Sequence, residues 1–386
     1  MTSSGGRSLS DPSVQTPAFV VDRGRLLQNV ERVEARSRAL GVKFRPHLKT
    51  AKSIEVARLI PSARAHGITV STVKEAEYFG SEGGDILYAV CVTQDKLARL
   101  AAVASRGCAV RLSVDCEDAV EGVIEGAREL GTSFDVLVEI DSGEHRSGLA
   151  PGDPRVVRLA ARLHESEGTR FNGVYTHAGH AYGTTDPAVI RAIAEDERVA
   201  AVTAAEAIRA AGVPCGIVSV GSTPTMTHVE HLEGVTEVRA GVWVFHDLYQ
   251  EALGSCSLDE ISGSVLSTVI GHQRDHGTIL IDAGGMALSK DRSTASLGPQ
   301  GDCGYGLLTT LDGRVLEGMK VEETFQEHGL VRGPAVDQSA FAEFPIGSRP
   351  RVYPNHSCMT AAAYARYLVV EGVDVVATWD RVNDWV

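Results

Sequence analysis

The strongest constraint on the fold is a repeated alternation of short apolar runs and amphipathic segments. The apolar runs occupy residues 44–48, 68–72, 86–92, 110–114, 136–140, 173–177, 217–220 and 237–245. Between them, apolar residues recur at helical spacing, as in 94–105, 117–130, 153–165 and 188–211. About eight strand–helix alternations are what a closed (β/α)8 barrel of the TIM type requires. An open doubly wound sheet gives similar local patterns, but no glycine-rich dinucleotide fingerprint follows the first strand. The pattern therefore favours the barrel.

The pattern changes near Leu253, where short β-like runs punctuated by Gly and Pro replace the alternation. These runs lie at 263–270, 278–281, 329–336, 351–353 and 373–378, and only 360–367 indicates a helix. We expect three parts: a leader and strand over 1–22, a barrel over 23–252, and a smaller β-rich C-terminal domain over 253–386. The strand at 18–22 precedes a helical segment at 23–40, and we expect that strand to join the C-terminal domain.

Composition limits the classes of partner. The 386 residues are 43% hydrophobic and 23% charged, and the formal net charge is −13. This charge argues against nucleic acid or an anionic membrane as the main partner, because both attract basic surfaces. Seven scattered cysteines indicate a reducing cytoplasm. We expect neither a signal peptide nor a membrane span, because the first residues are polar and no run of roughly 18 apolar residues occurs.

One lysine stands out within this pattern. Lys49 follows the apolar run at 44–48 and directly precedes a helical segment. Catalytic groups of a β/α barrel lie at the carboxyl ends of its strands. A lysine there presents a reactive amine, although a solvated lysine at a strand end is the commoner case.

Several other predicted strands deliver polar groups to the same end of the barrel. The first strand also carries His47, and the sixth strand with the residues after it supplies two tyrosines and two histidines: Tyr175, His177, His180 and Tyr182. Gly221, Ser222 and Thr223 follow the seventh strand, and Gly241 ends the eighth. Small and hydroxyl residues at this position allow backbone N–H groups to approach a phosphate. The loops after strands seven and eight are where barrels commonly bind phosphate.

Two further segments carry candidate chemistry. Arg146 follows the acidic end of the fifth strand and is either a site residue or an ion-pair partner of Glu139 or Asp141. In the C-terminal part, His356 and Cys358 are two positions apart in an extended segment. A nitrogen and a thiolate suit a borderline-soft cation such as Zn²⁺. Two protein ligands leave coordination positions open, which is typical of a catalytic site.

Three of these segments carry a resemblance to a known family. Pro46–Thr50, Val220–Thr225 and Pro354–Cys358 resemble the fold-type III pyridoxal 5′-phosphate (PLP) enzymes of the alanine-racemase-like fold, in the D-serine dehydratase and D-threonine aldolase family. The resemblance implies that Lys49 binds PLP and that the phosphate is held near Gly221, Ser222, Thr223 and Gly241. It also implies that Arg146 lies near the cofactor ring. We place His47, Tyr175 and Tyr182 among the cofactor contacts.

The resemblance also implies a reaction. D-serine dehydratases of the eukaryotic type carry His-x-Cys with zinc, whereas D-threonine aldolases carry His-x-Asp, so Cys358 favours the dehydratases. We expect a PLP- and Zn-dependent lyase that removes water and ammonia from a β-hydroxy D-amino acid, with D-serine as the first candidate. Lys49 removes the Cα proton, and the cation activates the β-hydroxyl. The alternatives are D-3-hydroxyaspartate dehydration and retro-aldol cleavage to glycine and an aldehyde, with His177 or His180 as the base.

Two alternatives outside this reaction class stay open. A non-catalytic PLP-binding barrel would resemble the first domain only, and a metal-dependent hydrolase would show more His and Asp ligands on the barrel strands. Relatives with this architecture are usually head-to-tail dimers, so the resemblance also implies a homodimer acting on a small D-amino acid.

Overall fold

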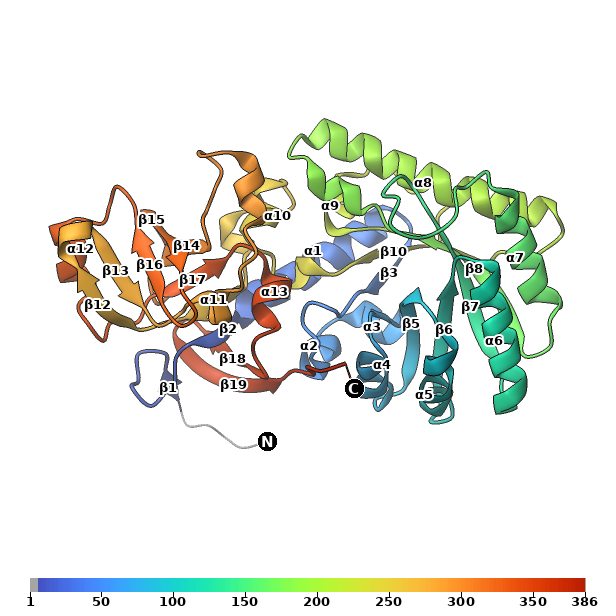
Figure 1. Cartoon of the computed structure of the whole chain (residues 1–386), viewed down its shortest axis with the longest axis horizontal. Helices are drawn as coiled ribbons and strands as arrows, with labels where there is room; N and C mark the ends of the chain where they lie inside the picture. Colours follow the sequence, from blue (N-terminus) through green and yellow to red (C-terminus); the bar gives the residue numbers. More distant parts are fainter. Residues whose placement is uncertain (1–5, 386) are drawn as a thin grey trace. The chain divides into compact units, whose positions relative to one another are not determined.

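The computed structural model describes residues 6–385 (Figure 1). Contacts divide the chain into two compact units. One contains the described residues through Glu31 together with Val242–Asn383, and the other contains Arg32–Gly241. The helix α1 (Arg23–Ala39) belongs to both, because the division falls within it. No helix among residues 6–385 combines the length and apolar character needed to cross a membrane.

The unit Arg32–Gly241 is built on eight parallel strands. They are β3 (Lys43–Pro46), β4 (Ile68–Val70), β5 (Gly84–Cys91), β6 (Cys108–Val114), β7 (Phe134–Ile140), β8 (Thr169–Thr176), β9 (Ile217–Val220) and β10 (Glu237–Ala240). Their order is β3-β10-β9-β8-β7-β6-β5-β4. A parallel bridge between His47 and Thr69 joins the two ends of this sheet. The predicted (β/α)8 barrel is therefore confirmed as a nearly closed barrel.

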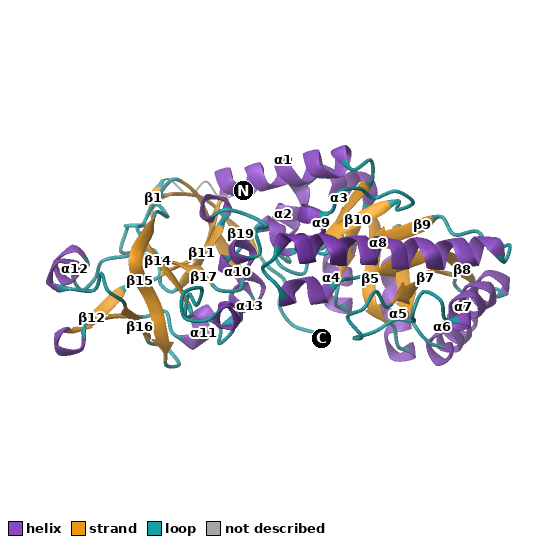
Figure 2. Cartoon of the chain, turned by 90° about the horizontal axis from the view of Figure 1, so that it is seen from above, coloured by secondary structure: helices purple, strands orange, loops and turns teal. Residues whose placement is uncertain are grey.

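Helices surround the barrel strands, as the two views in Figures 1 and 2 show. After β3 come two short helices, α2 (Ile54–Arg58) and α3 (Pro61–His66), and the later strands are followed in turn by α4 (Val73–Gly80), α5 (Gln94–Ala104), α6 (Glu117–Leu130), α7 (Pro154–Glu165), α8 (Pro187–Ala210) and α9 (Thr223–His228). Asp153 and Asp186 cap α7 and α8 by accepting backbone N–H bonds, and a proline opens each helix. The starts of α7 and α8 are therefore fixed by local capping residues, whereas α5 and α6 begin without a side-chain cap.

The other unit is built on an eleven-stranded, mostly antiparallel sheet. Its order is β1-β19-β18-β2-β11-β17-β14-β15-β16-β13-β12. The strands are β1 (Arg7–Ser8), β2 (Ala18–Asp22), β11 (Gly263–Leu266), β12 (Val269–Gln273), β13 (Thr278–Ile281), β14 (Gly306–Thr309), β15 (Val315–Thr324), β16 (Gly329–Arg332), β17 (Arg351–Pro354), β18 (Arg366–Glu371) and β19 (Asp374–Asp380). Four short helices connect them: α10 (Leu248–Ala252), α11 (Gly285–Leu288), α12 (Gln338–Glu343) and α13 (Ser357–Ala361).

The N-terminal strand β2 lies inside this sheet, as the sequence predicts. It pairs antiparallel with β11 and parallel with β18. Its Phe19 is fully buried, and the Phe19 ring centroid lies 5.5 Å from that of Phe245 and 5.2 Å from that of Tyr367. These aromatic contacts hold segments that are far apart in the chain in one core.

The helix predicted over 360–367 is wrong. The helix α13 ends at Ala361, and β18 begins at Arg366. β18 pairs with both β2 and β19, and its Tyr367, Val369 and Val370 are buried. Pairing on both sides of the strand overrides the local helical pattern. The domain boundaries at 22 and 252 stay predictions. The division of the chain by contacts, at Glu31 and Gly241, shows which residues pack together and does not test where a domain begins or ends.

Candidate active site

Lys49 lies just past the end of β3, where the barrel closes. The His47 N–H donates to the carbonyl of Ala240 at 2.8 Å, and the Leu48 N–H donates to that of Thr69 at 3.0 Å. Leu48 and Thr50 are buried, whereas Lys49 is exposed. The backbone is therefore fixed between β10 and β4 while the amine reaches outward. This is the geometry expected of a reactive lysine on a barrel rim.

Gly241 packs directly against this lysine segment. A Cβ atom placed at Gly241 would lie 3.3 Å from the backbone oxygen of His47 and 3.6 Å from Cε of Lys49. Glycine thus leaves open a space beside the lysine side chain at the end of β10.

Two histidines beside Lys49 are held uncharged. Burial is the main cause that lowers the pKa of His177, to about 3, and the Lys49 cation adds to it. Burial and Lys49 also lower the pKa of His47 well below its ordinary value. His177 Nδ1 lies 3.0 Å from the carbonyl oxygen of Gly221. A carbonyl only accepts, so Nδ1 carries the hydrogen and Nε2 keeps a free electron pair. His47 Nε2 lies 2.8 Å from the hydroxyl of Ser71.

The segment after β9 forms a tight turn into α9. Gly221 adopts φ = 127°, and a Cβ there would lie 2.2 Å from the backbone oxygen of Arg239. Ser222 caps α9 through a reciprocal pair of bonds with Thr225. The hydroxyl of Thr223, by contrast, is buried and has no hydrogen-bond partner among residues 6–385. A buried donor without a partner costs free energy, so this hydroxyl is suited to a ligand oxygen.

A buried carboxylate joins this turn to the segment after β8. Oε1 of Glu197, on α8, accepts the N–H groups of Ala178 and Gly221, both at 2.9 Å. Glu197 is 1% exposed, and burial raises its pKa. The carboxylate therefore ties the His177 segment to the Gly221 turn, and the N–H of Gly221 is already satisfied within the chain.

The other residues predicted after β8 lie in different surroundings. Tyr175 is 2% exposed, and its hydroxyl donates to Oε2 of Glu139 at 2.7 Å. The guanidinium of Arg239 lies over the Tyr175 ring, 5.1 Å from its centroid. His180 and Tyr182 are half-buried in the 3₁₀ turn Gly179–Gly183, and Nδ1 of His180 has no hydrogen-bond partner within the described part of the chain.

Arg146 pairs with a carboxylate that the sequence did not single out. Its guanidinium lies 3.5 Å from Oε2 of Glu144, and the Arg146 side chain is 55% exposed. The same carboxylate oxygen accepts the N–H of Gly179 at 3.2 Å. After burial and Lys49, the charge of Arg146 also contributes to the low pKa of His177. Glu139 and Asp141, the pairing partners considered for Arg146, instead bond to Ser147 and His145.

The second cluster lies in the other unit, around His356 and Cys358. His356 precedes α13, and Cys358 lies in its first turn. His356 Nδ1 lies 2.7 Å from Oδ2 of Asp291. Burial opposes the charged form of His356, but Asp291 and the adjacent Cys358 raise its pKa to about 11. The hydrogen bond from His356 is the main cause that lowers the pKa of Asp291, to about 2.

A buried aspartate anchors this cluster. Asp247 is fully buried, and its carboxylate accepts the N–H of Ser357 and that of Gln250, both at 2.9 Å. No group of three or more His, Cys, Asp or Glu side chains within residues 6–385 is arranged to hold a metal ion. His356 and Cys358 therefore offer two protein donors, and the carboxylate of Asp291 faces the ring of His356.

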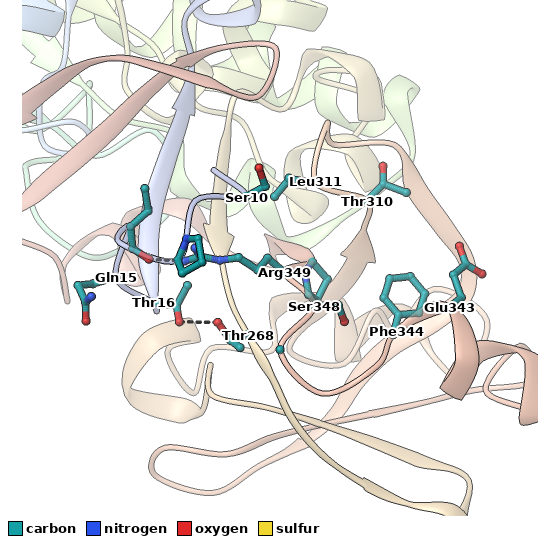
Figure 3. Close-up of a pocket in the computed structure, with 14 residues that line it drawn as sticks. Ser10, Gln15, Thr16, Thr268, Thr310, Leu311, Glu343, Phe344, Ser348 and Arg349 are labelled. Atoms are coloured by element: carbon teal, nitrogen blue, oxygen red, sulfur yellow. Dashed lines mark hydrogen bonds between the residues drawn. The ribbon is translucent and has the colours of Figure 1, made fainter. Parts of the chain in front are cut away.

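One cavity of about 760 Å³ is lined by none of the residues of the two clusters (Figure 3). Thr16 and Arg349 are among its lining residues. The Thr16 hydroxyl donates to Asp282 at 2.6 Å and lies 2.7 Å from that of Thr268. The Arg349 guanidinium donates to the carbonyls of Asp11 and Val14. These groups bond within the chain itself, so they stabilise the N-terminal segment.

Glu197, Arg239 and Asp291 were not predicted as site residues. Arg239 is 4% exposed and donates to the hydroxyl of Ser219 at 2.8 Å. One sequence signal could have indicated Arg239: it is a charged residue within an apolar run, where a charge must find a bonding partner. Nothing in the sequence identifies the bonding partners, which are distant in the chain.

The lysine on the barrel rim, the histidines beside it and the glycine turn after β9 all lie in a part of the chain that matches a known family. Residues 21–248 match the family described as "Alanine racemase, N-terminal domain". Residues 262–370 match the family described as "Putative serine dehydratase domain".

The chain is 44% identical over 377 residues to D-threo-3-hydroxyaspartate dehydratase of Delftia sp. (strain HT23), which covers 97% of this chain and 98% of that one. The solved structure of that enzyme superposes with a TM-score of 0.94, over 98% of this chain and all of the other. D-serine dehydratase of Dictyostelium discoideum is 28% identical over 381 residues, covering 93% and 94%. D-threonine aldolase of Filomicrobium marinum has a TM-score of 0.83 at 25% identity, covering 97% and 96%.

The chain belongs to this family of PLP-dependent lyases, which contains D-threo-3-hydroxyaspartate and D-serine dehydratases. The resemblance inferred from the three sequence segments is confirmed, and so is the lyase class.

Proposed function

We propose that this chain eliminates water from a β-hydroxy D-amino acid and that hydrolysis of the resulting enamine then releases ammonia and a 2-oxo acid. The first candidate substrate is D-threo-3-hydroxyaspartate, with oxaloacetate as the product. The main support for this proposal is the 44% identity to the Delftia enzyme over almost the full length of both chains. D-serine stands second, because the D-serine dehydratase of Dictyostelium discoideum is 28% identical. Retro-aldol cleavage stands third.

The residues on the barrel rim fit PLP. Lys49 supplies an exposed amine, and Gly241 leaves space beside that lysine's side chain. The buried hydroxyl of Thr223 has no acceptor among the described residues, and it lies at the location where barrels bind phosphate. Bound PLP supplies an electron sink that makes a Cα–H bond acidic. We propose that Lys49 holds PLP and that Thr223 contacts its phosphate, with Gly221, Ser222 and Gly241 leaving room for it. The N–H groups of Gly221 and Ser222 already bond to Glu197 and Thr225, so the Thr223 hydroxyl is the donor. Arg146, His47, Tyr175 and Tyr182 stay candidate contacts.

We assign proton movement at Cα to Nζ of Lys49. His177 is suited to accept a proton at Nε2, because its Nδ1–H is directed at the Gly221 carbonyl. His177 stays uncharged across the neutral range, because burial lowers its pKa. An uncharged base at this position is also what retro-aldol cleavage requires, so His177 and His180 serve that alternative as well.

The His356 and Cys358 pair fits a divalent cation, and we propose Zn²⁺. Nitrogen and sulfur donors suit a borderline-soft ion. A D-threo-3-hydroxyaspartate dehydratase has been solved as a cysteine-to-alanine mutant in a metal-free form and as a histidine-to-alanine mutant, altered two positions apart. His356 and Cys358 have the same separation. A cation there supplies Lewis acidity for a hydroxyl leaving group.

Product analysis tests the reaction. We would incubate the PLP- and zinc-loaded protein separately with D-threo-3-hydroxyaspartate, D-serine and D-threonine. We expect 2-oxo acid and ammonia, with the highest kcat/KM for the hydroxyaspartate. Glycine and an aldehyde as the only products would refute dehydration. A higher kcat/KM for D-serine would refute the assignment of the substrate.

Metal removal and size measurement test the other two parts of the proposal. Treatment with EDTA should abolish dehydration, and zinc should restore it; an unaffected rate would refute the role of the cation. We also propose a homodimer, which light scattering during size-exclusion chromatography would detect as twice the 41.0 kDa mass of the chain.

A further inference from the structure

We propose that Asp291 is a positioning residue that fixes the imidazole of His356 so that Nε2 is presented to the cation. This inference rests on the proposed metal site at His356 and Cys358. It adds a third side chain that does not bind the cation itself.

The carboxylate of Asp291 is itself held in place. Its Oδ2 lies 2.7 Å from Nδ1 of His356. Its Oδ1 accepts the N–H of Ser293 at 2.8 Å and the hydroxyl of Ser293 at 2.5 Å. Both carboxylate oxygens are therefore used, one by the backbone turn and the other by the ring. A carboxylate that is fixed in this way restricts rotation of the imidazole.

Further bonds join the two segments that carry this pair. The side-chain amide of Asn355 donates to the hydroxyl of Thr294 at 2.7 Å and to the carbonyl of Gly304 at 2.8 Å, and its oxygen accepts the Thr294 N–H at 3.0 Å. The Thr360 hydroxyl donates to the Leu288 carbonyl at 2.9 Å. The segments 288–294 and 355–360 are thus connected on both sides of the Asp291–His356 bond.

The chemistry of the pair selects one ring nitrogen. A carboxylate accepts hydrogen bonds, so Nδ1 of His356 keeps its hydrogen, and Nε2 is the nitrogen that offers its electron pair once the cation displaces its proton. Cys358 follows two residues later, in the first turn of α13. Histidine ligands of metals commonly donate their second ring N–H to a carboxylate, and loss of this partner weakens metal binding by about 10- to 100-fold.

The chain contains a matched control for the local role of Asp291. Asp337 precedes α12 and accepts the N–H of Ser339 at 2.8 Å and its hydroxyl at 2.5 Å. The turn is thus the same Asp-x-Ser arrangement, and its carboxylate bonds to no histidine in the interactions of the described chain. Asp337→Ala removes these turn bonds and the bond to the Ala340 N–H at 3.2 Å but no contact with a ring, whereas Asp291→Ala removes the turn bonds and the support of the ring.

The experiment is zinc affinity of the full-length, PLP-loaded protein after chelator stripping, measured by competition with a chromophoric zinc chelator. We expect Asp291→Ala to weaken zinc binding by about 10- to 100-fold. Asp291→Asn keeps an oxygen acceptor and should lie between Asp291→Ala and the wild type. Asp337→Ala should stay within twofold of the wild type. An Asp291→Ala affinity within twofold of the wild type would overturn the inference, and so would equal losses in both alanine variants.

A second readout separates positioning from direct ligation. The absorption bands of bound Co²⁺ report the ligand set, so Asp291→Asn saturated with Co²⁺ should show the same band positions as the wild type. Shifted bands would mean that Asp291 is itself a ligand and would overturn the positioning role. If the wild-type protein bound neither zinc nor cobalt, the proposed metal site would fail as well. If the wild type bound both ions and the Asp291 variants bound them equally well, the positioning role alone would fail.

Discussion

The closing strands of the barrel, β3 and β10, depend on a buried ion pair below Lys49. Arg45 Nε lies 3.2 and 3.1 Å from the two carboxylate oxygens of Glu237, and the side chains are 4% and 5% exposed. Glu237 also accepts the hydroxyl of Ser219 at 2.7 Å, and Arg45 also pairs with Asp85 at 2.9 Å. Removing one partner leaves a buried charge without its main compensation.

We predict that Arg45→Met and Glu237→Leu each lower the free energy of unfolding by about 3–5 kcal/mol. The loss in Glu237→Leu should lie at the lower end of this range, because Arg45 keeps its ion pair with Asp85. For a unit of this size the losses correspond to roughly 6–20 °C in Tm. The double variant, in which both charges are replaced by apolar groups, should lose at least about 2 kcal/mol less than the sum of the two single losses.

The assay is calorimetry of the metal- and PLP-free protein. Urea unfolding of the wild type, the two single variants and the double variant then gives the four free energies of unfolding that are compared. The pairing argument would be refuted if each single variant lost less than about 1 kcal/mol, the range of exposed ion pairs. Additive losses in the double variant would refute it too. Either result would mean that the strand pairing itself, rather than the ion pair, closes the barrel.

Three further predictions concern the barrel unit. Gly122→Ala in α6, where an added Cβ meets no atom within 4 Å, should stabilise the protein by about 0.5–1 kcal/mol in urea unfolding. Gly241→Val should weaken PLP binding by roughly tenfold in a fluorescence titration, because it overpacks the space beside Lys49. His177 binds its proton in the unfolded chain below about pH 6.5 but in the native protein only near pH 3. The free energy of unfolding should therefore fall by about 1.4 kcal/mol per pH unit as the pH is lowered through this range, and less steeply in His177→Asn.

The barrel strands could be predicted because their signal is local. Each of the eight apolar runs contains or overlaps one observed strand, and the ends differ by a few residues. The helix predicted over 360–367 failed where the outcome depends on distant partners, since β18 is fixed by β2 and β19. A pattern of apolar residues describes one segment and contains no information on which segment will cover it.

The candidate site shows the same division. Lys49, His177 and the Gly221 turn could be placed at one rim, because strand ends of a parallel barrel share an edge. Their supporting contacts could not be predicted, since Glu197 reaches Gly221 across 24 positions and Asp291 reaches His356 across 65. The sequence around a single Asp or Glu does not show that its carboxylate will support a site residue. Their importance follows only from the bonds that the fold creates.

The covalent attachment of PLP to Lys49 is the central claim, and peptide mapping after borohydride reduction tests it most directly. We would load the protein with PLP, reduce it, digest it and locate the modified residue by mass spectrometry. The modification should lie on Lys49, and Lys49→Ala should lose both the modification and the visible absorption band of the bound cofactor. Modification of a different lysine in the wild type, or an unchanged band in Lys49→Ala, would contradict the account.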